Sequence, residues 1–434
     1  MEISSQKLEL YSKLFNTSEK NKLARNAVTS SKLSNILLNR EKAQKHNRIF
    51  SNEIKVKTVP SDQKSSGRCW LFAMCNMLRL KMNAKYGFDE FEFSQSYLAF
   101  YDKLERSNFF LSIIIKYRDE PVNSRINELF LKEPISDGGN WNMILNLVNK
   151  YGVVPKACFN ESEHSNNTSS IDDFLSNKLR DYAYLIRNLS STEFKDIDKY
   201  LNKFMEEIYK VLVIFMGEPP KLFDWEFLYK GKYTIMKELT PLEFYKKHVP
   251  TNLDDYILLA DNPILKYGTK FTVNNFNNMK DGREIEYINV PIDIIKMSIK
   301  KSIDNYEGLW FGSDVGKYWT GKLSVLDTDM VNYKNVFDTD ISLNKKNRLL
   351  YKTSDVNHAM IIRGYDNQTN QSNKSTSCNK PTPTPKPTSK PKKIGKIQLK
   401  SKRQLQVYGR SKSTKTTKTT KSTKPTKSTM NSSK

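Results

Sequence analysis

The sequence predicts an α+β fold, and three observations lead to this class. Residues 69–86 read CWLFAMCNMLRLKMNAKY, and apolar side chains occupy almost every face of this stretch, which predicts a helix buried in the core. Residues 170–250 are predicted to be mainly helical and are rich in Leu, Tyr and Lys. After about residue 255 the pattern changes to short β-like runs bounded by Gly, Asn and Asp. A helical front followed by a β-rich back is typical of α+β proteins.

The helical front begins with an N-terminal arm. Helical spacing is present in QKLELYSKLF and SSKLSNILLNREKA, within residues 1–55. After the buried helix, Ser94 is placed to cap a second largely apolar helix, QSYLAFYDKLERSNFFLSIII. A third helix in NWNMILNLVNKYGVVP is predicted to end at Gly152, because glycine commonly follows a helix C-terminus.

The β-rich back ends in a segment of different composition. The predicted strands lie in DDYILLA, TKFTV, REIEYINV, GLWFGSDV and HAMIIRGYD. From about residue 367 the chain becomes a Pro-punctuated linker, PTPTPKPTSKPKK, and then a Lys/Thr-rich low-complexity run. Such compositions bury too little apolar surface to fold, so residues 367–434 are predicted to be a disordered tail. Only IGKIQLKSKRQLQVYG has a pattern that suits a short strand pair.

The chain length and charge limit the function classes. With 434 residues, the chain exceeds the ~100–200 residues of one ordinary domain, and 38% hydrophobic residues are enough for a sizeable core. A formal net charge of +24 is typical of proteins that bind nucleic acid. Most of this excess comes from residues 371–434, which hold 18 basic and no acidic residues. Residues 1–370 carry 53 basic against 47 acidic residues, so the body is only weakly basic.

The four cysteines predict a reducing compartment. Cys69, Cys75, Cys158 and Cys378 are too few for a disulfide framework, and their spacing matches no zinc pattern. The N-terminus has no apolar signal-peptide core, and no apolar run reaches the ~18 residues of a membrane span. We expect a soluble cytoplasmic protein with no membrane contact, metal or cofactor.

Cys69 is the candidate nucleophile. It lies where the buried helix should begin, and the unpaired N–H groups at a helix N-terminus favour a thiolate. Gly67 lets the preceding loop turn, and Gln63 can fold its amide back toward the sulfur, where it could stabilise an oxyanion together with a backbone N–H. An isolated cysteine in apolar surroundings is usually an inert core residue, and Cys75, Cys158 and Cys378 are interpreted in that way.

His358 is the candidate base among four histidines. In DVNHAMIIRGYD it begins a predicted strand, which is a rigid support, although a lone histidine before a strand is often structural. His46, His164 and His248 lie in a charged helical stretch, an Asn/Ser-rich loop and a Lys-flanked turn, and each is predicted to be a solvated surface residue.

Several blocks carry a family resemblance. QKSSGRCWLFA, FEFSQSYLAFYDKLER, DGGNWNMILNLVNKYGVVPKACFNES, PIDIIKMSIKKSIDNYEGLWFGSDVGK and NHAMIIRGYD resemble, in order, the bleomycin hydrolase and aminopeptidase C branch of the papain-like cysteine peptidases. The resemblance implies a papain-like, two-lobed peptidase domain over residues 1–366. It also implies a helical insertion at about residues 160–255. Residues 367–434 form the basic tail and lie outside the region of resemblance.

The same resemblance implies the site and the activity. By position, Cys69 matches the nucleophile, His358 the general base and acid, and Gln63 the oxyanion donor. Gly138 and Gly139 match the segment along the substrate backbone, although a plain turn also explains these two glycines. The implied function is thiol-dependent hydrolysis of peptide amide bonds, as an aminopeptidase, and the implied assembly is a homo-hexamer.

The resemblance stops at the C-terminus. The family follows its histidine strand with ENSWG, whose Asn orients the imidazole, and no such segment is present; Asn379 is at a comparable distance but in a linker. The β lobe is therefore expected to be incomplete and to expose a sheet edge. The family's restriction to N-terminal residues is associated with its own C-terminus in the cleft, so the choice between exopeptidase and endopeptidase specificity stays open at this point. The alternative function is a catalytically weak papain-fold scaffold whose basic tail binds nucleic acid non-specifically.

Overall fold

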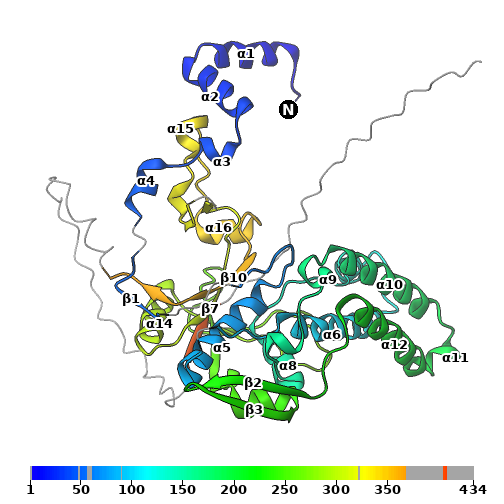
Figure 1. Cartoon of the computed structure of the whole chain (residues 1–434). Coiled ribbons are helices and arrows are strands. Elements are labelled where there is room, and N and C mark those ends of the chain that lie inside the picture. Colours follow the sequence, from blue (N-terminus) through cyan, green and yellow to red (C-terminus); the bar gives the residue numbers. More distant parts are fainter. Residues whose placement is uncertain are drawn as a thin grey trace, which may run out of the picture.

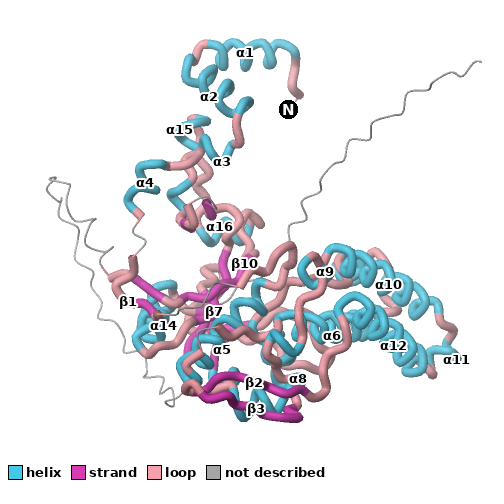
Figure 2. The backbone as a smooth tube through the Cα atoms, in the orientation of Figure 1, coloured by secondary structure: helices cyan, strands magenta, loops and turns pink. Residues whose placement is uncertain are grey.

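The computed structural model describes residues 2–46, 49–55, 61–88, 90–320 and 323–367, together with the backbone of residues 404–407. Helices and strands form an α+β arrangement, as predicted (Figures 1 and 2). The helices are α1 (Ser5–Asn16), α2 (Glu19–Ser30), α3 (Leu33–Ile36), α4 (Arg40–Lys45), α5 (Cys69–Tyr86), α6 (Gln95–Lys116), α7 (Arg125–Lys132), α8 (Trp141–Tyr151), α9 (Glu163–Asn166), α10 (Ser169–Asn188), α11 (Ser191–Phe194), α12 (Ile197–Met216), α13 (Pro241–His248), α14 (Ile292–Asp304), α15 (Tyr333–Phe337) and α16 (Lys345–Leu350). Three short 3-10 helices are η1 (Lys156–Cys158), η2 (Leu253–Asp255) and η3 (Thr328–Met330).

The strands form one central sheet and three small ribbons. They are β1 (Asn52–Glu53), β2 (Phe223–Tyr229), β3 (Lys232–Leu239), β4 (Tyr256–Ala260), β5 (Lys270–Phe271), β6 (Tyr287–Asn289), β7 (Leu309–Ser313), β8 (Trp319–Thr320), β9 (Val325–Leu326), β10 (His358–Ile362), β11 (Gly364–Tyr365) and β12 (Gln404–Val407). In the central sheet the order is β10-β7-β12-β4-β6-β5. The predicted β-like runs supply β4, β5, β6, β7, β10 and β11.

Strand β12 lies inside the central sheet, between β7 and β4, while β10 ends the sheet as an edge strand. It pairs in parallel with β4, placing Leu405 opposite Ile257, and it also pairs in parallel with β7, where Val407 lies opposite Phe311. The sheet is therefore continuous at this point. Residues 404–407 belong to the segment predicted to be a disordered tail, but they lie within IGKIQLKSKRQLQVYG, the stretch of it whose pattern suits a strand. Gln and apolar residues alternate there with the period of a strand, and β7 and β4 provide backbone partners on both sides. The rest of residues 368–434, including Asn379 and Cys378, lies outside the described residues.

A second correction concerns the helical insertion. Helices α9 to α12 are present, but residues 223–239 form the antiparallel hairpin of β2 and β3. Lys230 and Gly231 make its turn with positive φ angles of 50° and 76°, as a two-residue hairpin turn requires. Aromatic and acidic residues alternate in FDWEF, as in a strand. The Lys-rich and Tyr-rich composition of the surrounding residues led to the prediction of helix instead.

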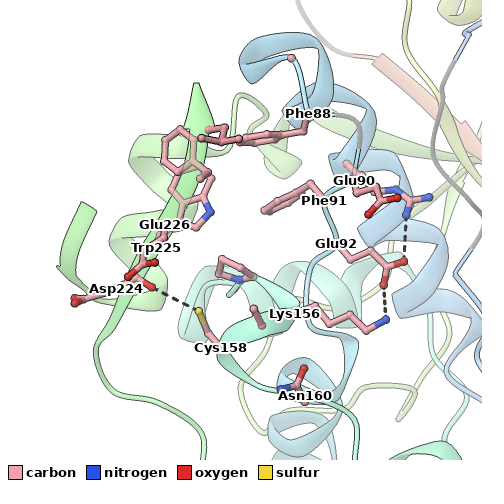
Figure 3. A pocket seen from close by; sticks show the side chains of 16 residues that line it. Phe88, Glu90, Phe91, Glu92, Lys156, Cys158, Asn160, Asp224, Trp225 and Glu226 are labelled. Atoms are coloured by element: carbon pink, nitrogen blue, oxygen red, sulfur yellow. Dashed lines mark hydrogen bonds and ion pairs between the residues drawn. The ribbon is translucent and has the colours of Figure 1, made fainter. Parts of the chain in front are cut away.

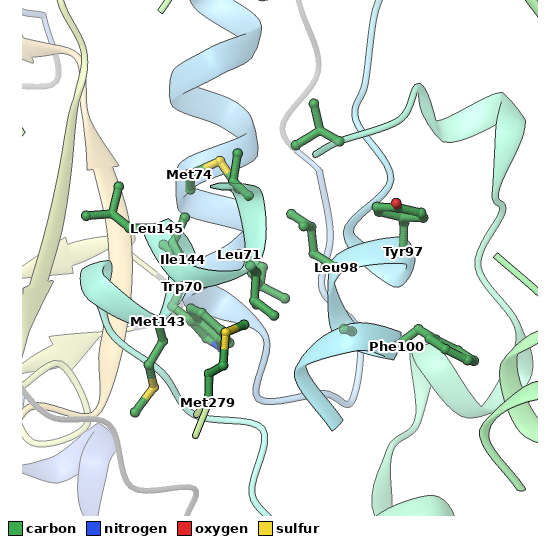
Figure 4. Packing of buried hydrophobic residues seen from close by; sticks show 14 of the residues in the cluster. Trp70, Leu71, Met74, Tyr97, Leu98, Phe100, Met143, Ile144, Leu145 and Met279 are labelled. Atoms are coloured by element: carbon green, nitrogen blue, oxygen red, sulfur yellow. The ribbon is translucent and has the colours of Figure 1, made fainter. Parts of the chain in front are cut away.

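The core forms where α5 meets α6 and α8 (Figure 4). Trp70, Leu98 and Ile144 come from these three helices and are fully buried. The indole of Trp310, on β7, donates a hydrogen bond to the carbonyl of Trp70 at 3.0 Å, which joins the sheet to the start of α5. Ser94 caps α6 and Gly152 follows α8, as predicted. No helix in the described part of the chain is both long enough and apolar enough to cross a membrane.

The N-terminal arm consists of four helices, α1 to α4, with most apolar side chains of α1 exposed. Its contacts are with the segment that contains η3 and α15, beside which it lies in Figure 1. Lys20 pairs with Asp338 at 2.7 Å, and Lys42 pairs with Asp329 at 3.2 Å. The predicted helices of residues 1–55 are therefore present and lie outside the main core.

Candidate active site

Cys69 is the first residue of α5, as predicted, and its side chain is buried. Its Sγ atom accepts a hydrogen bond from the backbone N–H of Ala359 at 3.4 Å. Ala359 follows His358 on β10, so the predicted nucleophile lies against the strand that begins with the predicted base, although the two residues are 289 positions apart in sequence. The buried helix and the sheet thus place Cys69 beside the start of β10.

His358 is held by its strand. Its backbone lies opposite Ser313 in the antiparallel pair of β10 and β7, and the residue is half-buried. Burial lowers the pKa of the imidazole below 6.5, because the charged form loses solvation. Within the described residues, no hydrogen bond from another side chain orients the ring. A neutral imidazole at neutral pH is the form that can accept a proton from a thiol.

Asn357, next to His358, was not selected by sequence reasoning. Its Oδ1 accepts backbone hydrogen bonds from Val315 at 2.9 Å and Gly316 at 3.2 Å, and its Nδ2 donates to Asp314 at 2.9 Å. The side chain therefore ties the start of β10 to the loop after β7. The signal was an Asn directly before the candidate base, a position that can bind neighbouring backbone.

The pKa of Cys69 differs from the sequence prediction. Burial raises it above the ordinary value of 9.0, while hydrogen bonds from the backbone N–H groups of Ala359, Trp70 and Cys69 act in the opposite direction. The charge of Asp137 raises it further. The helix N-terminus has the predicted effect, but desolvation is larger, so the thiol is expected to keep its proton at neutral pH.

Gln63 lies in the loop before Cys69, but its amide makes a different contact from the predicted one. Its Nε2 donates to the carbonyl of Ser66 at 2.6 Å, and the Ser66 hydroxyl donates back to the carbonyl of Gln63 at 2.6 Å. A primary amide has two N–H groups, so one remains for an oxyanion. The reciprocal pair closes the loop and fixes where that second N–H can reach.

Gly138 and Gly139 lie beside the nucleophile loop. Gly138 accepts a hydrogen bond from Arg106 at 2.5 Å through its carbonyl. Gly139 packs on Trp70, and a Cβ atom there would lie 2.5 Å from the indole carbons. Close packing therefore requires Gly139 to be a glycine, while its predicted contact with a substrate backbone stays a prediction.

The remaining histidines and cysteines have other surroundings. His46 lies 3.0 Å from Asp327, the ring of His164 packs on Phe215, and His248 packs on Trp225 and Phe244. All three are half-buried, so the prediction of solvated surface residues was wrong in this detail. Cys75 is buried and Cys158 half-buried, both as free thiols, and burial raises the pKa of each. These surroundings agree with their interpretation as inert cysteines.

A cavity of about 1050 Å³ lies at the other end of α5 (Figure 3). Phe88, Phe91 and Trp225 form its aromatic lining, and Glu92 pairs there with Lys156 at 2.5 Å. Cys158 faces the carbonyl of Asp224 in the same cavity. Neither Cys69 nor His358 lines it, so it is separate from the candidate catalytic pair.

Comparison with known proteins agrees with this geometry. The model of the Peptidase C1-like family matches residues 2–379. Bleomycin hydrolase of Mus musculus is 38% identical over 380 residues, which cover 85% of this chain and 84% of that protein. Aminopeptidase C of Listeria monocytogenes is 36% identical over 329 residues, covering 75% and 74% of the two chains. The crystal structure of PepW from Lactobacillus rhamnosis matches with a TM-score of 0.81 and 34% identity, covering 84% of this chain and 83% of that one. The predicted papain-like fold is thus confirmed, and the chain belongs to the Peptidase C1-like family of cysteine peptidases.

Proposed function

We propose that this chain hydrolyses peptide amide bonds with Cys69 as the nucleophile and His358 as the general base and acid. The observation that carries the proposal is the hydrogen bond from the N–H of Ala359 to the Sγ of Cys69, which sets the sulfur against the strand that begins with His358. Membership in the Peptidase C1-like family, with aminopeptidases among its relatives, supports peptides as substrates.

The proposed reaction starts from a neutral Cys69 thiol and a neutral His358 imidazole. In the attack step, the Sγ–C bond forms, the carbonyl π electrons move to oxygen, and the thiol proton passes to His358. The Cys69 backbone N–H and the free N–H of Gln63 stabilise the oxyanion. When the C–N bond breaks, His358 returns the proton to the leaving amine, and a thioester remains. Water then attacks this thioester with His358 as base, and Cys69 leaves as the thiol.

The aminopeptidase specificity is a finer part of the proposal. Relatives named aminopeptidase C and aminopeptidase W are 36% and 35% identical to this chain. We therefore propose release of N-terminal residues as the reaction, with a substrate backbone lying along Gly138 and Gly139. Three further expectations stay predictions: a cytoplasmic location, a homo-hexamer, and non-specific nucleic-acid contact through residues 371–434.

The test is replacement of the sulfur. Cys69→Ser should lower hydrolysis of aminoacyl fluorogenic amides to background, because an alcohol is far less acidic than a thiol and His358 cannot activate it equally. The matched control is Cys158→Ser, which changes a half-buried thiol that the mechanism does not use. Equal rates in Cys69→Ser and the unmodified chain would remove Cys69 from the reaction. Release of internal fragments from an N-terminally blocked peptide would replace the aminopeptidase assignment by an endopeptidase one.

A further inference from the structure

One buried residue, Asp137, holds the loop that delivers Cys69 at two points. The backbone N–H of Gly67 donates to Oδ2 of Asp137 at 2.9 Å, and the indole of Trp70 donates to the Asp137 carbonyl at 2.6 Å. Gly67 and Trp70 flank the Arg68–Cys69 dipeptide. One residue therefore holds the chain on both sides of the nucleophile.

The carboxylate of Asp137 belongs to a buried charge cluster. Lys103, on α6, donates to Oδ1 of Asp137 at 2.7 Å, and the Thr168 hydroxyl donates to Oδ2. Lys103 also donates to Asp172 on α10. The exposed side-chain fractions are 2% for Lys103, 7% for Asp137 and 17% for Asp172. The cluster thus links two helices to the loop of the nucleophile.

The ionisation of these groups follows from their contacts. Burial alone would raise the pKa of Asp137, but Lys103, Thr168 and the Gly67 N–H together hold it well below its usual range. Burial would lower the pKa of Lys103, and the two carboxylates instead raise it. Burial and the neighbouring Asp137 raise the pKa of Asp172 to about 6, against the effect of Lys103. At neutral pH, Asp137 is therefore an anion.

A contribution to stability does not by itself explain why these charges are buried here, because replacing a buried ion pair by apolar residues is often neutral or stabilising. The hydrogen bonds that Asp137 accepts explain the need for a carboxylate better. A carboxylate accepts from a backbone N–H, a hydroxyl and an ammonium group at once, whereas an amide has one accepting oxygen. A Cβ atom on Gly67 would lie 2.6 Å from the Cβ of Asp137, so the loop packs directly on this side chain.

Arg68 provides a second anchor from the other side. Its guanidinium pairs with Glu161 at 2.9 Å, and its Nε donates to the Ser66 hydroxyl at 3.0 Å. Ser66 in turn holds Gln63. The Gly67–Arg68 peptide is thus fixed between Asp137 and the Arg68–Glu161 pair, and it leads directly into the Cys69 N–H.

We propose that Asp137, paired with Lys103, is a positioning residue of the oxyanion hole, holding the Gly67 backbone and Trp70 so that the Cys69 N–H and Gln63 point at the developing oxyanion. The inference rests on the proposed peptidase function. It assigns to Asp137 an effect on the transition state and not on substrate affinity.

The experiment compares Asp137→Asn with Glu105→Gln. Glu105 is an equally buried carboxylate, 6% exposed, on the same helix as Lys103, and it pairs with Lys150 at 2.6 Å, away from the nucleophile loop. We expect Asp137→Asn to lower kcat by roughly 10–100-fold with KM within about threefold, because misdirected oxyanion donors raise the barrier without weakening substrate binding. Glu105→Gln should leave both constants unchanged.

Two thiol probes separate positioning from unfolding. Leucine aldehyde forms a hemithioacetal whose oxygen occupies the oxyanion hole, so its affinity should fall in Asp137→Asn by a factor similar to that for kcat. Alkylation of Cys69 by iodoacetamide needs no oxyanion hole, and its rate should stay within about threefold of the unmodified chain or increase slightly, because a nearby negative charge is removed.

The outcomes are distinct. A parallel fall in kcat and alkylation rate, or unchanged kcat and aldehyde affinity, would overturn the positioning role of Asp137. If the unmodified chain turns over no peptide, the proposed function fails, and the aldehyde affinities of the two variants still decide the positioning role. If Asp137→Asn does not fold, Thr168→Val is the second variant, because it removes one hydrogen-bond donor to the same carboxylate. We expect kcat and aldehyde affinity to fall together in this variant, by smaller factors, with the alkylation rate unchanged.

Discussion

The two halves of the candidate catalytic pair are held in place in different ways. On the thiol side, Asp137 and Arg68 anchor the loop before Cys69 through buried ion pairs, and Trp70 is hydrogen-bonded through both its indole and its carbonyl. On the imidazole side, strand pairing and the hydrogen bonds of Asn357 hold the backbone of His358, and no described side chain bonds to the ring. The sulfur is therefore fixed by several independent contacts, and the imidazole by the position of its backbone.

This difference suggests where catalysis is most sensitive to small changes. On the thiol side the loss of one contact leaves others in place, except at Asp137, which holds both Gly67 and Trp70. The direction of the imidazole depends on how precisely the start of β10 is held. The two sides also share a property. Cys69 is buried and His358 half-buried, and in each the loss of solvation shifts the pKa toward the neutral form.

Apart from the loss of the Cys69 sulfur itself, the largest effect is expected on the imidazole side, for His358→Gln. Glutamine keeps a polar side chain but cannot take a proton at neutral pH, so kcat should fall by roughly 10²–10⁴-fold with KM within about threefold. The matched control is His248→Gln on α13, where the ring packs on Trp225 and Phe244. Steady-state rates on an aminoacyl amide give the comparison. A kcat within twofold of the unmodified chain would show that another group is the base.

The sequence was sufficient to predict the parts of the site that depend on local pattern. Cys69 opens a helix that is apolar nearly all round, Ser94 and Gly152 mark helix ends by their own chemistry, and His358 begins a short apolar strand. In each case a few neighbouring residues contain the whole signal. Local propensity and the final structure agree at these positions.

The parts that were missed depend on partners distant in sequence. Lys103 and Asp137 are ordinary charged residues until α6 and the loop before α8 bring them together. The strand pattern of β12 is local, but its place in the central sheet was missed for a related reason, because its backbone partners, β4 and β7, lie more than ninety residues upstream. The direction of the Cys69 pKa shift was also missed, since the extent of burial is a tertiary property.

A smaller effect is expected for Asn357→Ala. The variant loses two hydrogen bonds from the backbone N–H groups of Val315 and Gly316 and one to Asp314, so the start of β10 becomes less well fixed. We expect kcat to fall on the order of 10-fold, as is typical when a catalytic group is misplaced slightly.

The matched control for this variant is Asn344→Ala. Asn344 caps α16 by accepting from the N–H of Asn347, so its loss costs about 1 kcal/mol of stability without touching β10. Thermal unfolding and kcat are measured on both variants. If the two variants lose stability equally and neither loses activity, the contacts of Asn357 serve the fold and not the base.

The smallest effect is in the pH dependence, and it tests the property that both sides share. Because burial lowers the pKa of His358, the imidazole stays neutral to below pH 6.5, and the acid limb of kcat/KM should lie below that value. Because burial raises the pKa of Cys69, the thiol keeps its proton to above pH 9.0, and the alkaline limb should lie above that value. Iodoacetamide alkylation of Cys69 should then accelerate continuously between pH 7 and pH 9.0, since it follows the small thiolate fraction. A constant alkylation rate between about pH 5 and 7 would instead indicate a preformed thiolate–imidazolium pair, which would mean that the charges of the two groups stabilise each other by more than their burial costs.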